Sequence, residues 1–342
     1  MYKAPVLLVA RTIIFVTYKM LLVVGVMWII AACVSGEGAR SSSTSPDGRH
    51  APFKEWQVID TTTGQPVSLD QWMVLLLQQD IIYLGEEHHN RFHIDAAMTV
   101  LRKLKAEGRI PVLAMEMFGW DGQAALDQYL SGPEVSHQEF LETVRWQQNW
   151  GGPYEDYEPL VRLAKEQQWD IEAMNPPKAL VRIVAKNGLA QAGSDPMMAQ
   201  WGMKDEAMVD DPVYRTRILQ QLQACHGGGT DSLYQKMFEA SMVRDEGMAK
   251  TLVYRLNQIR SGANAMAGPL VSYTGGGHIQ YNLPVPKRVA RRLTDQVRQV
   301  SVYMTSFELG RIEEVQDMIR EKIADYLWLT PVSTQGPPRR CR

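Results

Sequence analysis

The stretch DIIYLGEEHHNRFHI, residues 80–94, decides the fold class of this 342-residue chain. Its apolar run Ile81–Leu84 predicts a short buried strand, and Gly85 allows a sharp turn where that strand ends. The next residues place apolar side chains at helical spacing as far as Leu104, and Gly108 then predicts the end of this helix. A strand that passes through a polar loop into a helix is the repeating unit of α/β proteins.

Four further short apolar runs are separated by helical patterns: Val112–Met115, Ile171–Met174, Leu270–Tyr273 and Val297–Met304. This alternation predicts an α/β fold with a mostly parallel sheet flanked by helices. Residues 178–264 are Met-rich and amphipathic without a convincing strand, which predicts a smaller all-helical domain inserted into that fold. The last helical pattern covers residues 311–329, with a stripe formed by Ile312, Val315, Ile319 and Ile323.

Composition and known motifs exclude several classes of function. The formal net charge of −2 gives no basic field for nucleic acid. The chain contains no P-loop, no GxGxxG fingerprint and no nucleophile elbow, so nucleotide-binding and serine-hydrolase functions have no support. Of the three cysteines, only Cys225 and Cys341 would remain free after cleavage and lipidation at a lipobox, and the sequence alone predicts no disulfide between them.

The N-terminus predicts a lipoprotein. Residues 21–30 have the length and apolarity of a signal-peptide core, and they lead into Ala31-Ala32-Cys33, which resembles a bacterial lipobox. Cys33 would then carry diacylglycerol and anchor the protein to a lipid bilayer. Val34, rather than Asp, follows it and favours the outer membrane, at its periplasmic face or the cell surface. An uncleaved transmembrane anchor is the alternative.

These patterns divide the chain into five parts. We expect a signal peptide with a lipobox at residues 1–33, a flexible tether at 34–54, an α/β domain at 55–177 and 265–330, a helical insertion at 178–264, and a disordered tail at 331–342.

The candidate site lies where the predicted strands end. Ligands of open parallel sheets bind outside the carboxyl ends of the strands. Side chains that follow three of the strands are Glu86, His88, Glu116 and His278. Imidazoles and carboxylates could hold a divalent metal that activates water, or they could act as acid–base pairs without one. They could also serve only to hydrogen-bond loops and cap helices.

Three other stretches are weaker candidates. His226 precedes a Gly-Gly-Gly run in the helical region, and Trp150 and Tyr154 belong to an aromatic cluster in residues 145–160 that could line a flat apolar ligand. For His89 and His93 we expect structural roles. For the basic stretch Lys287, Arg288, Arg291 and Arg292, we expect a solvated helix face rather than an anion site.

Eight separated segments resemble the ChaN-like haem-binding lipoproteins, within the wider superfamily that includes Tiki proteases and erythromycin esterases. The segments follow one another in family order: YLGEEHHNRFHI, AMEMF, WQQNWGGPYEDYEPL, AMNPPKALVRIVAKNGL, HGGG, EASMVRDEGMAKTL, YTGGGHIQYNLPVPKRV and ADYLWLTP. The resemblance covers about residues 58–331 and implies a haem-binding lipoprotein that serves haem and iron uptake at the outer membrane.

The resemblance also implies a ligand set. Haem would be held by a tyrosine with a histidine nearby, for which Tyr154 and Tyr281 are the tyrosine candidates. Trp150, His226 and His278 are the further haem-contact candidates. A homodimer and an outer-membrane haem receptor are the implied protein partners. In the Tiki branch, the positions of Glu86, His88, Glu116 and His278 support metal-dependent hydrolysis, so a peptidase or esterase is the alternative function.

Overall fold

The computed structural model describes residues 52–293 and 295–334, which belong to one compact unit. The predicted signal peptide, its lipobox at Cys33 and most of the predicted tether lie outside these residues, as does most of the predicted tail. Within the described ranges, no helix is both long enough and apolar enough to cross a membrane.

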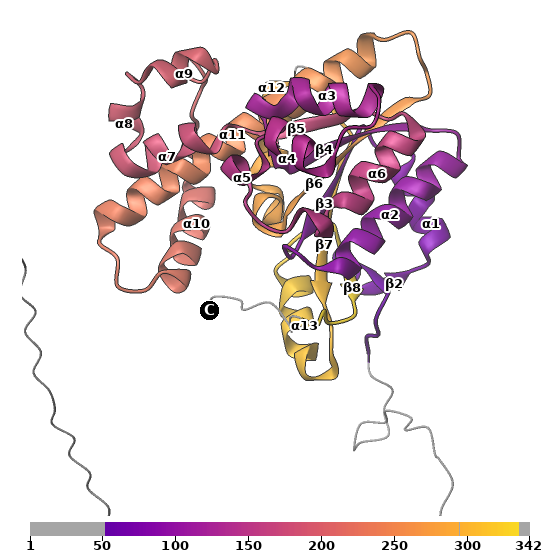
Figure 1. Cartoon of the computed structure of the whole chain (residues 1–342). Coiled ribbons are helices and arrows are strands. Elements are labelled where there is room, and N and C mark those ends of the chain that lie inside the picture. The colour runs from indigo at the N-terminus through magenta and orange to yellow at the C-terminus, as the bar shows by residue number, and fades with distance from the viewer. Residues whose placement is uncertain (1–51, 294, 335–342) are drawn as a thin grey trace, which may run out of the picture. The chain divides into compact units, whose positions relative to one another are not determined.

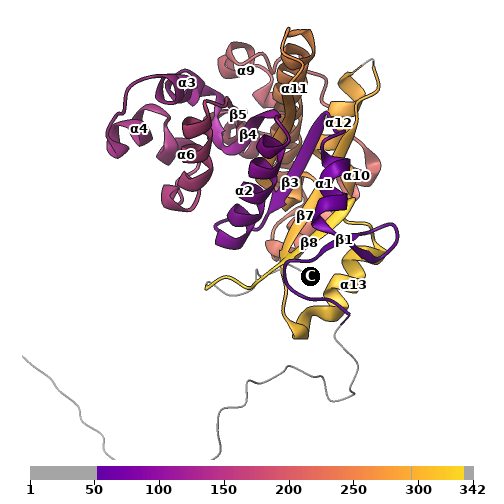
Figure 2. The ribbon, with the colours of Figure 1, turned by 90° about the vertical axis from the view of Figure 1, so that its right-hand side faces the viewer.

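An eight-stranded sheet forms the centre of the fold, in the order β2-β1-β8-β7-β3-β6-β4-β5 (Figures 1 and 2). Six strands run parallel, and the short strands β1 and β2 add an antiparallel edge beside β8. This confirms the predicted α/β class with a mostly parallel sheet. The strands are β1 (Val58–Asp60), β2 (Gln65–Val67), β3 (Ile81–Glu86), β4 (Ile110–Gly119), β5 (Ile171–Asn175), β6 (Ala267–Gly275), β7 (Gln299–Ser306) and β8 (Tyr326–Thr330).

The helices cover both faces of the sheet. They are α1 (Leu69–Leu76), α2 (Arg91–Ala106), α3 (Gln123–Ser131), α4 (His137–Thr143), α5 (Trp146–Asn149), α6 (Glu158–Gln167), α7 (Lys178–Asn187), α8 (Leu189–Ala192), α9 (Pro196–Gln200), α10 (Pro212–Cys225), α11 (Asp231–Ser261), α12 (Val285–Arg292) and α13 (Ile312–Arg320). Short 3₁₀ turns join several of these elements.

The packing of β3 shows why its first four positions, Ile81–Leu84, form a continuous apolar run. Ile82 and Leu84 pack into the core that α2 and α6 share with the sheet. Ile81 and Tyr83 point to the other face and pack into the core formed with α11 and α12. A strand buried on both faces therefore reads as a continuous apolar run rather than an alternating one.

Helices α7–α11 lie between β5 and β6 in the chain, over the residues predicted as a helical insertion. Figure 1 shows α7–α10 to one side of the sheet, with α11 running from them back to the sheet. Phe238 and Val243 of α11 pack among these helices, whereas Leu252 and Leu256 pack on the sheet. At the end of α10, Cys225 is disulfide-bonded, and the prediction about Cys341 lies outside the described residues.

Two sequence predictions were wrong. The last helix ends at Arg320, and residues 326–330 form β8 instead, because this segment pairs with both β7 and β1.

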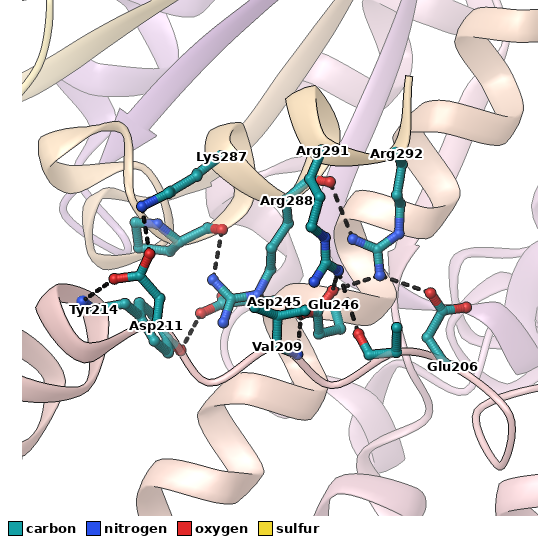
Figure 3. Close-up of polar contacts among 12 residues, drawn as sticks. Glu206, Val209, Asp211, Tyr214, Asp245, Glu246, Lys287, Arg288, Arg291 and Arg292 are labelled. Carbon is teal, nitrogen blue, oxygen red and sulfur yellow. Dashed lines mark hydrogen bonds and ion pairs between the residues drawn. The ribbon is translucent and has the colours of Figure 1, made fainter. Parts of the chain in front are cut away.

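The basic stretch is not a solvated helix face. Figure 3 shows its arginines, on α12, directed at the buried Glu246 of α11, and the Arg288 side chain is only 5% exposed.

Candidate functional site

The site lies at the C-terminal ends of β3, β4 and β6, which neighbour one another in the sheet. Glu86 ends β3 and pairs in register with Gly275, the last residue of β6. Glu116 comes from β4, and His278 comes from the 3₁₀ turn that follows β6. The structure therefore brings together Glu86, His88, Glu116 and His278, which the sequence analysis singled out.

Glu86 and His88 form the first histidine–carboxylate pair. The His88 Nδ1 lies 2.8 Å from Oε1 of Glu86, whose side chain is fully buried. The hydroxyls of Tyr157 and Tyr273 donate to the same carboxylate at 2.8 and 2.6 Å, which compensates for its burial. Burial would lower the pKa of His88, but its hydrogen bond to Glu86 and the nearby carboxylate charges outweigh burial and raise it.

His278 is held between two buried carboxylates. Its Nε2 lies 3.3 Å from Oε1 of Glu116, and its Nδ1 lies 2.5 Å from Oδ1 of Asp245, on α11. Burial would lower the pKa of His278, but the charges of Glu116 and Asp245 and their hydrogen bonds raise it to about 10. The imidazole is therefore a cation at neutral pH.

The second oxygen of Glu116 is anchored by the end of β6. Its Oε2 accepts hydrogen bonds from the Thr274 hydroxyl at 2.6 Å and from the Gly275 backbone N–H at 2.7 Å. Burial would raise the pKa of Glu116, but His278, together with the charges of His88 and Arg244, holds it well below its usual range. Both carboxylates are thus fixed by several donors before any ligand enters.

Close backbone packing explains two glycines of the site. A Cβ on Gly85 would lie 2.5 Å from Cδ1 of Ile279, and one on Gly275 would lie 2.7 Å from Cε1 of His88. Such distances are shorter than van der Waals contact, so both positions need a residue without a side chain. The two Gly-x-x-His stretches are therefore fitted against one another.

The histidines and carboxylates of the site are arranged as hydrogen-bonded pairs. In the part of the chain that the structure describes, no group of three or more His, Cys, Asp or Glu side chains is placed to hold a metal ion. The metal centre considered from Glu86, His88, Glu116 and His278 therefore has no support in their arrangement.

A cavity of about 690 Å³ opens above these pairs. This volume lies within the range of small-molecule and cofactor sites. Glu86, His88 and His278 contribute to its lining from the sheet side, and α10 supplies Arg217 and Gln221. Three aromatic or aliphatic side chains complete an apolar part of the wall: Tyr281, Tyr303 and Ile323.

Of the two tyrosine candidates, only Tyr281 lines this cavity. Its hydroxyl donates to Oε2 of Glu321 at 2.8 Å, and the Arg217 guanidinium lies 4.2 Å from its ring centroid. Burial, together with the bond to Glu321, raises the pKa of Tyr281 to about 12. Tyr154 instead is buried in the core, where its ring packs against Phe140.

The other candidates lie around the rim or away from it. The Trp150 indole packs edge-on against the His88 ring, with ring centroids 4.8 Å apart. His226 is exposed beyond the end of α10, and its backbone carbonyl accepts a hydrogen bond from the Tyr234 hydroxyl. His226 is not among the residues that line the cavity, although the preceding Cys225 is.

His89 and His93 have structural contacts, as their sequence positions indicated. His89 Nδ1 lies 2.7 Å from Oδ2 of Asp156. His93 is fully buried and its Nδ1 accepts a hydrogen bond from the backbone N–H of Glu87 at 2.9 Å. Burial lowers the pKa of His93 to about 4, despite the Glu87 charge, so this ring is neutral at neutral pH.

Sequence reasoning missed Asp245, Tyr157 and Tyr273. Asp245 and Glu246 are adjacent acids in the stretch MVRDEGM of α11, residues 242–248, and both are buried. Charged residues are rarely buried unless they are paired, so two acids in such a stretch were a usable signal. Tyr157 and Tyr273 carry no comparable signal, because a buried tyrosine is usual in a core.

A mostly parallel α/β sheet with a cavity at the carboxyl ends of its strands is typical of ligand-binding domains. Within that class, the chain belongs to the family described as haem-binding uptake, Tiki superfamily, ChaN, whose sequence profile matches residues 72–289. The predicted resemblance is thereby confirmed, and the family supports haem as the ligand. Among proteins with curated functions, none matches this chain.

One solved structure shows that the fold is similar to that of ChaN. ChaN of Campylobacter jejuni with cofacially bound haem is 18% identical, covers 80% of this chain and 96% of its own, and superposes with a TM-score of 0.60. At this identity the likeness shows the fold alone. The erythromycin esterase EreC in its open conformation is 14% identical over 74% of this chain and 77% of its own, with a TM-score of 0.39. A Bacillus cereus protein is 13% identical over 75% of this chain and 72% of its own, also with a TM-score of 0.39.

Proposed function

We propose that this protein binds haem in the cavity above the two histidine–carboxylate pairs, and that it serves haem uptake as an outer-membrane lipoprotein. The observation that carries the proposal is that a chain of a haem-binding family has a cavity of about 690 Å³ at the carboxyl edge of its sheet. The cavity wall combines an apolar part with a phenol, a donor known to ligate haem iron in catalase.

Tyr281 is the residue that would hold the haem iron. Its phenol lines the cavity and its ring lies beside the Arg217 guanidinium, whose positive charge opposes part of the increase in the phenol pKa that burial and Glu321 cause. Haem would supply a ferric centre for the phenolate and a flat apolar surface for the wall. Arg217 would also be placed to meet a haem carboxylate, because its side chain is 42% exposed and its contact with Glu321, at 3.4 Å, is long.

A hemin titration followed in the Soret region tests this proposal. We expect saturable binding with a high-spin ferric spectrum, and a changed spectrum with weaker binding in Tyr281→Phe. Tyr154→Phe is the matched control, because this phenol lies in the core and should leave the spectrum unchanged. If the wild-type protein shows neither a Soret shift nor saturation, the haem proposal is wrong.

Lipidation and location need separate experiments, because Cys33 lies outside the described residues. We expect radioactive palmitate to label the wild-type protein in cells, and the Cys33→Ser variant to lose the label. Fractionation of the two membranes should place the labelled protein in the outer membrane. Labelling that survives in Cys33→Ser would refute this anchor.

A homodimer and an outer-membrane haem receptor remain proposed partners. Light scattering with and without hemin tests whether the protein forms the homodimer.

A second candidate function is hydrolysis, with His88 and Glu86 as the acid–base pair. The observation that favours it is that His88 is held by Glu86 on one side while its side chain is 43% exposed and lines the cavity. An oriented imidazole of this kind can take a proton from water as it attacks an ester or peptide carbonyl, and can return it to the leaving group. A screen with ester and peptide substrates tests this function. It fails if His88→Ala hydrolyses every responsive substrate as fast as the wild type.

A further inference from the structure

A second cavity, of about 290 Å³, lies at the N-terminal ends of the strands, whereas the proposed haem cavity lies at their C-terminal ends. It is formed where β3, β4, β6 and β7 begin, together with the C-terminal part of α11. The charged side chains in its lining are Asp80, Arg109, Arg260 and Arg298. None of them takes part in the histidine–carboxylate pairs.

Asp80 holds two of the three arginines in place. Its Oδ2 accepts hydrogen bonds from the Arg298 backbone N–H at 2.9 Å and from Nη2 of Arg260 at 3.1 Å. Its Oδ1 accepts from Nη2 of Arg298 at 3.3 Å. Asp80 therefore accepts three hydrogen bonds, which hold Arg260 and Arg298 on either side of one carboxylate.

Arg109 is fixed independently of Asp80. Its Nε donates to the carbonyl of Gly268 at 3.1 Å, and its Nη2 donates to the carbonyl of Ala267 at 3.3 Å. These contacts orient the guanidinium at the start of β6 and neutralise none of its charge. A backbone-anchored arginine of this kind loses little further conformational freedom when it binds an anion.

The cluster has an excess of positive charge and of hydrogen-bond donors. Three guanidinium groups and one carboxylate leave a net charge of +2 on the charged side chains of the lining. In the contacts that the described residues make, Nη1 of each arginine has no hydrogen-bond acceptor. A phosphate dianion matches this charge, and guanidinium forks match the geometry of its oxygens.

We infer that this cavity is a binding site for a phosphate group, which Arg109, Arg260 and Arg298 would contact together. The ligand is small, because the volume lies at the lower end of the range for small-molecule sites. The shared chemistry is a phosphate group, carried either by a soluble anion or by a lipid headgroup. This inference does not depend on haem binding, which uses the other edge of the sheet.

The alternative role for these residues is structural, with the arginines tying the strand starts to Asp80. The two roles predict opposite effects of Asp80→Asn. If the cavity binds phosphate, loss of the negative charge raises the anion affinity, because the net charge increases while the amide oxygen still accepts the Arg298 backbone N–H. If the role is only structural, the same change loosens the cluster and cannot raise the affinity.

Calorimetric titration of the wild-type protein with pyrophosphate at low ionic strength is the first arm of the test. We expect saturable binding that weakens about tenfold or more in Arg260→Gln/Arg298→Gln, because each variant side chain loses a charged hydrogen bond. Arg298→Gln alone guards against misfolding, because this side chain is 60% exposed. Arg102→Gln, on the exposed side of α2, removes one positive charge away from the cavity, as many as Arg298→Gln alone, and should bind as the wild type does.

Vesicle binding forms the second arm and identifies the source of the phosphate. Vesicles of phosphatidylglycerol mixed with phosphatidylcholine are compared with phosphatidylcholine alone. Binding to pyrophosphate alone assigns a soluble phosphate, and arginine-dependent binding to the anionic vesicles assigns a lipid headgroup. The inference is overturned if neither probe binds, if Arg102→Gln weakens binding as much as the cavity variant does, or if folded Asp80→Asn binds pyrophosphate less tightly than the wild type.

Discussion

Replacement of Glu246 by Gln should destabilise the protein more than any single surface substitution. Glu246 is fully buried on α11 and forms ion pairs with three arginines of α12 (Figure 3). Oε1 lies 3.1 Å from Nε of Arg288, and Oε2 lies 2.8 Å from Nη2 of Arg291 and also contacts Arg292. Oε1 also accepts the backbone N–H of Val209 at 3.2 Å.

The expected loss of unfolding free energy follows from the buried arginine charge that Glu246→Gln leaves without a carboxylate. Arg288 is only 5% exposed, so its charge would stay buried without a carboxylate, and breaking a buried pair in this way costs about 3–5 kcal/mol. Gln keeps one carbonyl oxygen, and Arg292 keeps Glu206 at 2.7 Å, so we expect the lower end, about 3 kcal/mol. At roughly 2–4 °C per kcal/mol for a domain of this size, the melting temperature should fall by about 6–12 °C.

Urea unfolding followed by circular dichroism measures this free energy, and a thermal scan measures the melting temperature. Arg291→Gln is the matched control, because that side chain is 31% exposed and its loss leaves Glu246 paired with the other two arginines. We expect it to cost less than about 1 kcal/mol. A Glu246→Gln variant within about 1 kcal/mol of the wild type would refute the reasoning that the buried charge of α12 depends on this carboxylate.

Three further predictions concern the site and its packing. Because the folded pKa of His278 is raised from 6.5 to about 10, its contribution to stability is complete below pH 6.5 and is lost as pH rises through about 10. The unfolding free energy should therefore fall between neutral pH and pH 10, and it should fall less in His278→Asn, as urea titrations at several pH values would measure. Gly275→Ala places a Cβ 2.7 Å from the His88 ring and should displace that ring from Glu86. NMR titration should then find the pKa of His88 closer to 6.5, and an unchanged pKa of His88 would contradict this packing. Gly247→Ala places a Cβ 2.2 Å from Cγ of Pro176 and should cost about 1–3 kcal/mol in unfolding free energy, whereas Gly227→Ala, with no atom within 4 Å, should cost less.

The fold class could be predicted because the strands are buried on both faces and so stand out as apolar runs. The last strand could not, because the stripe of Ile312, Val315, Ile319 and Ile323 reads as a helix that continues to residue 329. The chain instead leaves α13 at Arg320 and forms β8, which is stabilised by partners on both sides, β7 and β1. Strand pairing of this kind depends on segments far away in the sequence, so the periodicity of the local sequence cannot predict it.

Some residues of the candidate site could likewise be predicted from the sequence, and others could not. Residues that follow predicted strands could be placed together, because parallel strands bring their carboxyl ends to one edge. Asp245 could not be placed there, because it comes from a helix and contacts His278 across 33 positions of sequence. The arginines of α12 were misread for the same reason. Their density suggested a solvated face, and only the tertiary structure pairs them with Glu246.

Adjacent positions on α11 connect the site to the packing of α12. Asp245 holds His278 and accepts a hydrogen bond from the Tyr214 hydroxyl at 2.5 Å, while Glu246, the next residue, binds the arginines. The Arg288 guanidinium in turn lies over the Tyr214 ring, 4.1 Å from its centroid. The floor of the proposed haem cavity and the α11–α12 contact are therefore one electrostatic unit. At the cavity floor, three carboxyl groups face the imidazoles of His88 and His278, so the floor has no excess of positive charge that could attract the carboxylates of haem. The arginine that lines the cavity wall is Arg217, on α10, whose side chain is 42% exposed. Haem bound in this cavity should therefore turn its carboxylates toward α10 and its apolar edge toward the sheet.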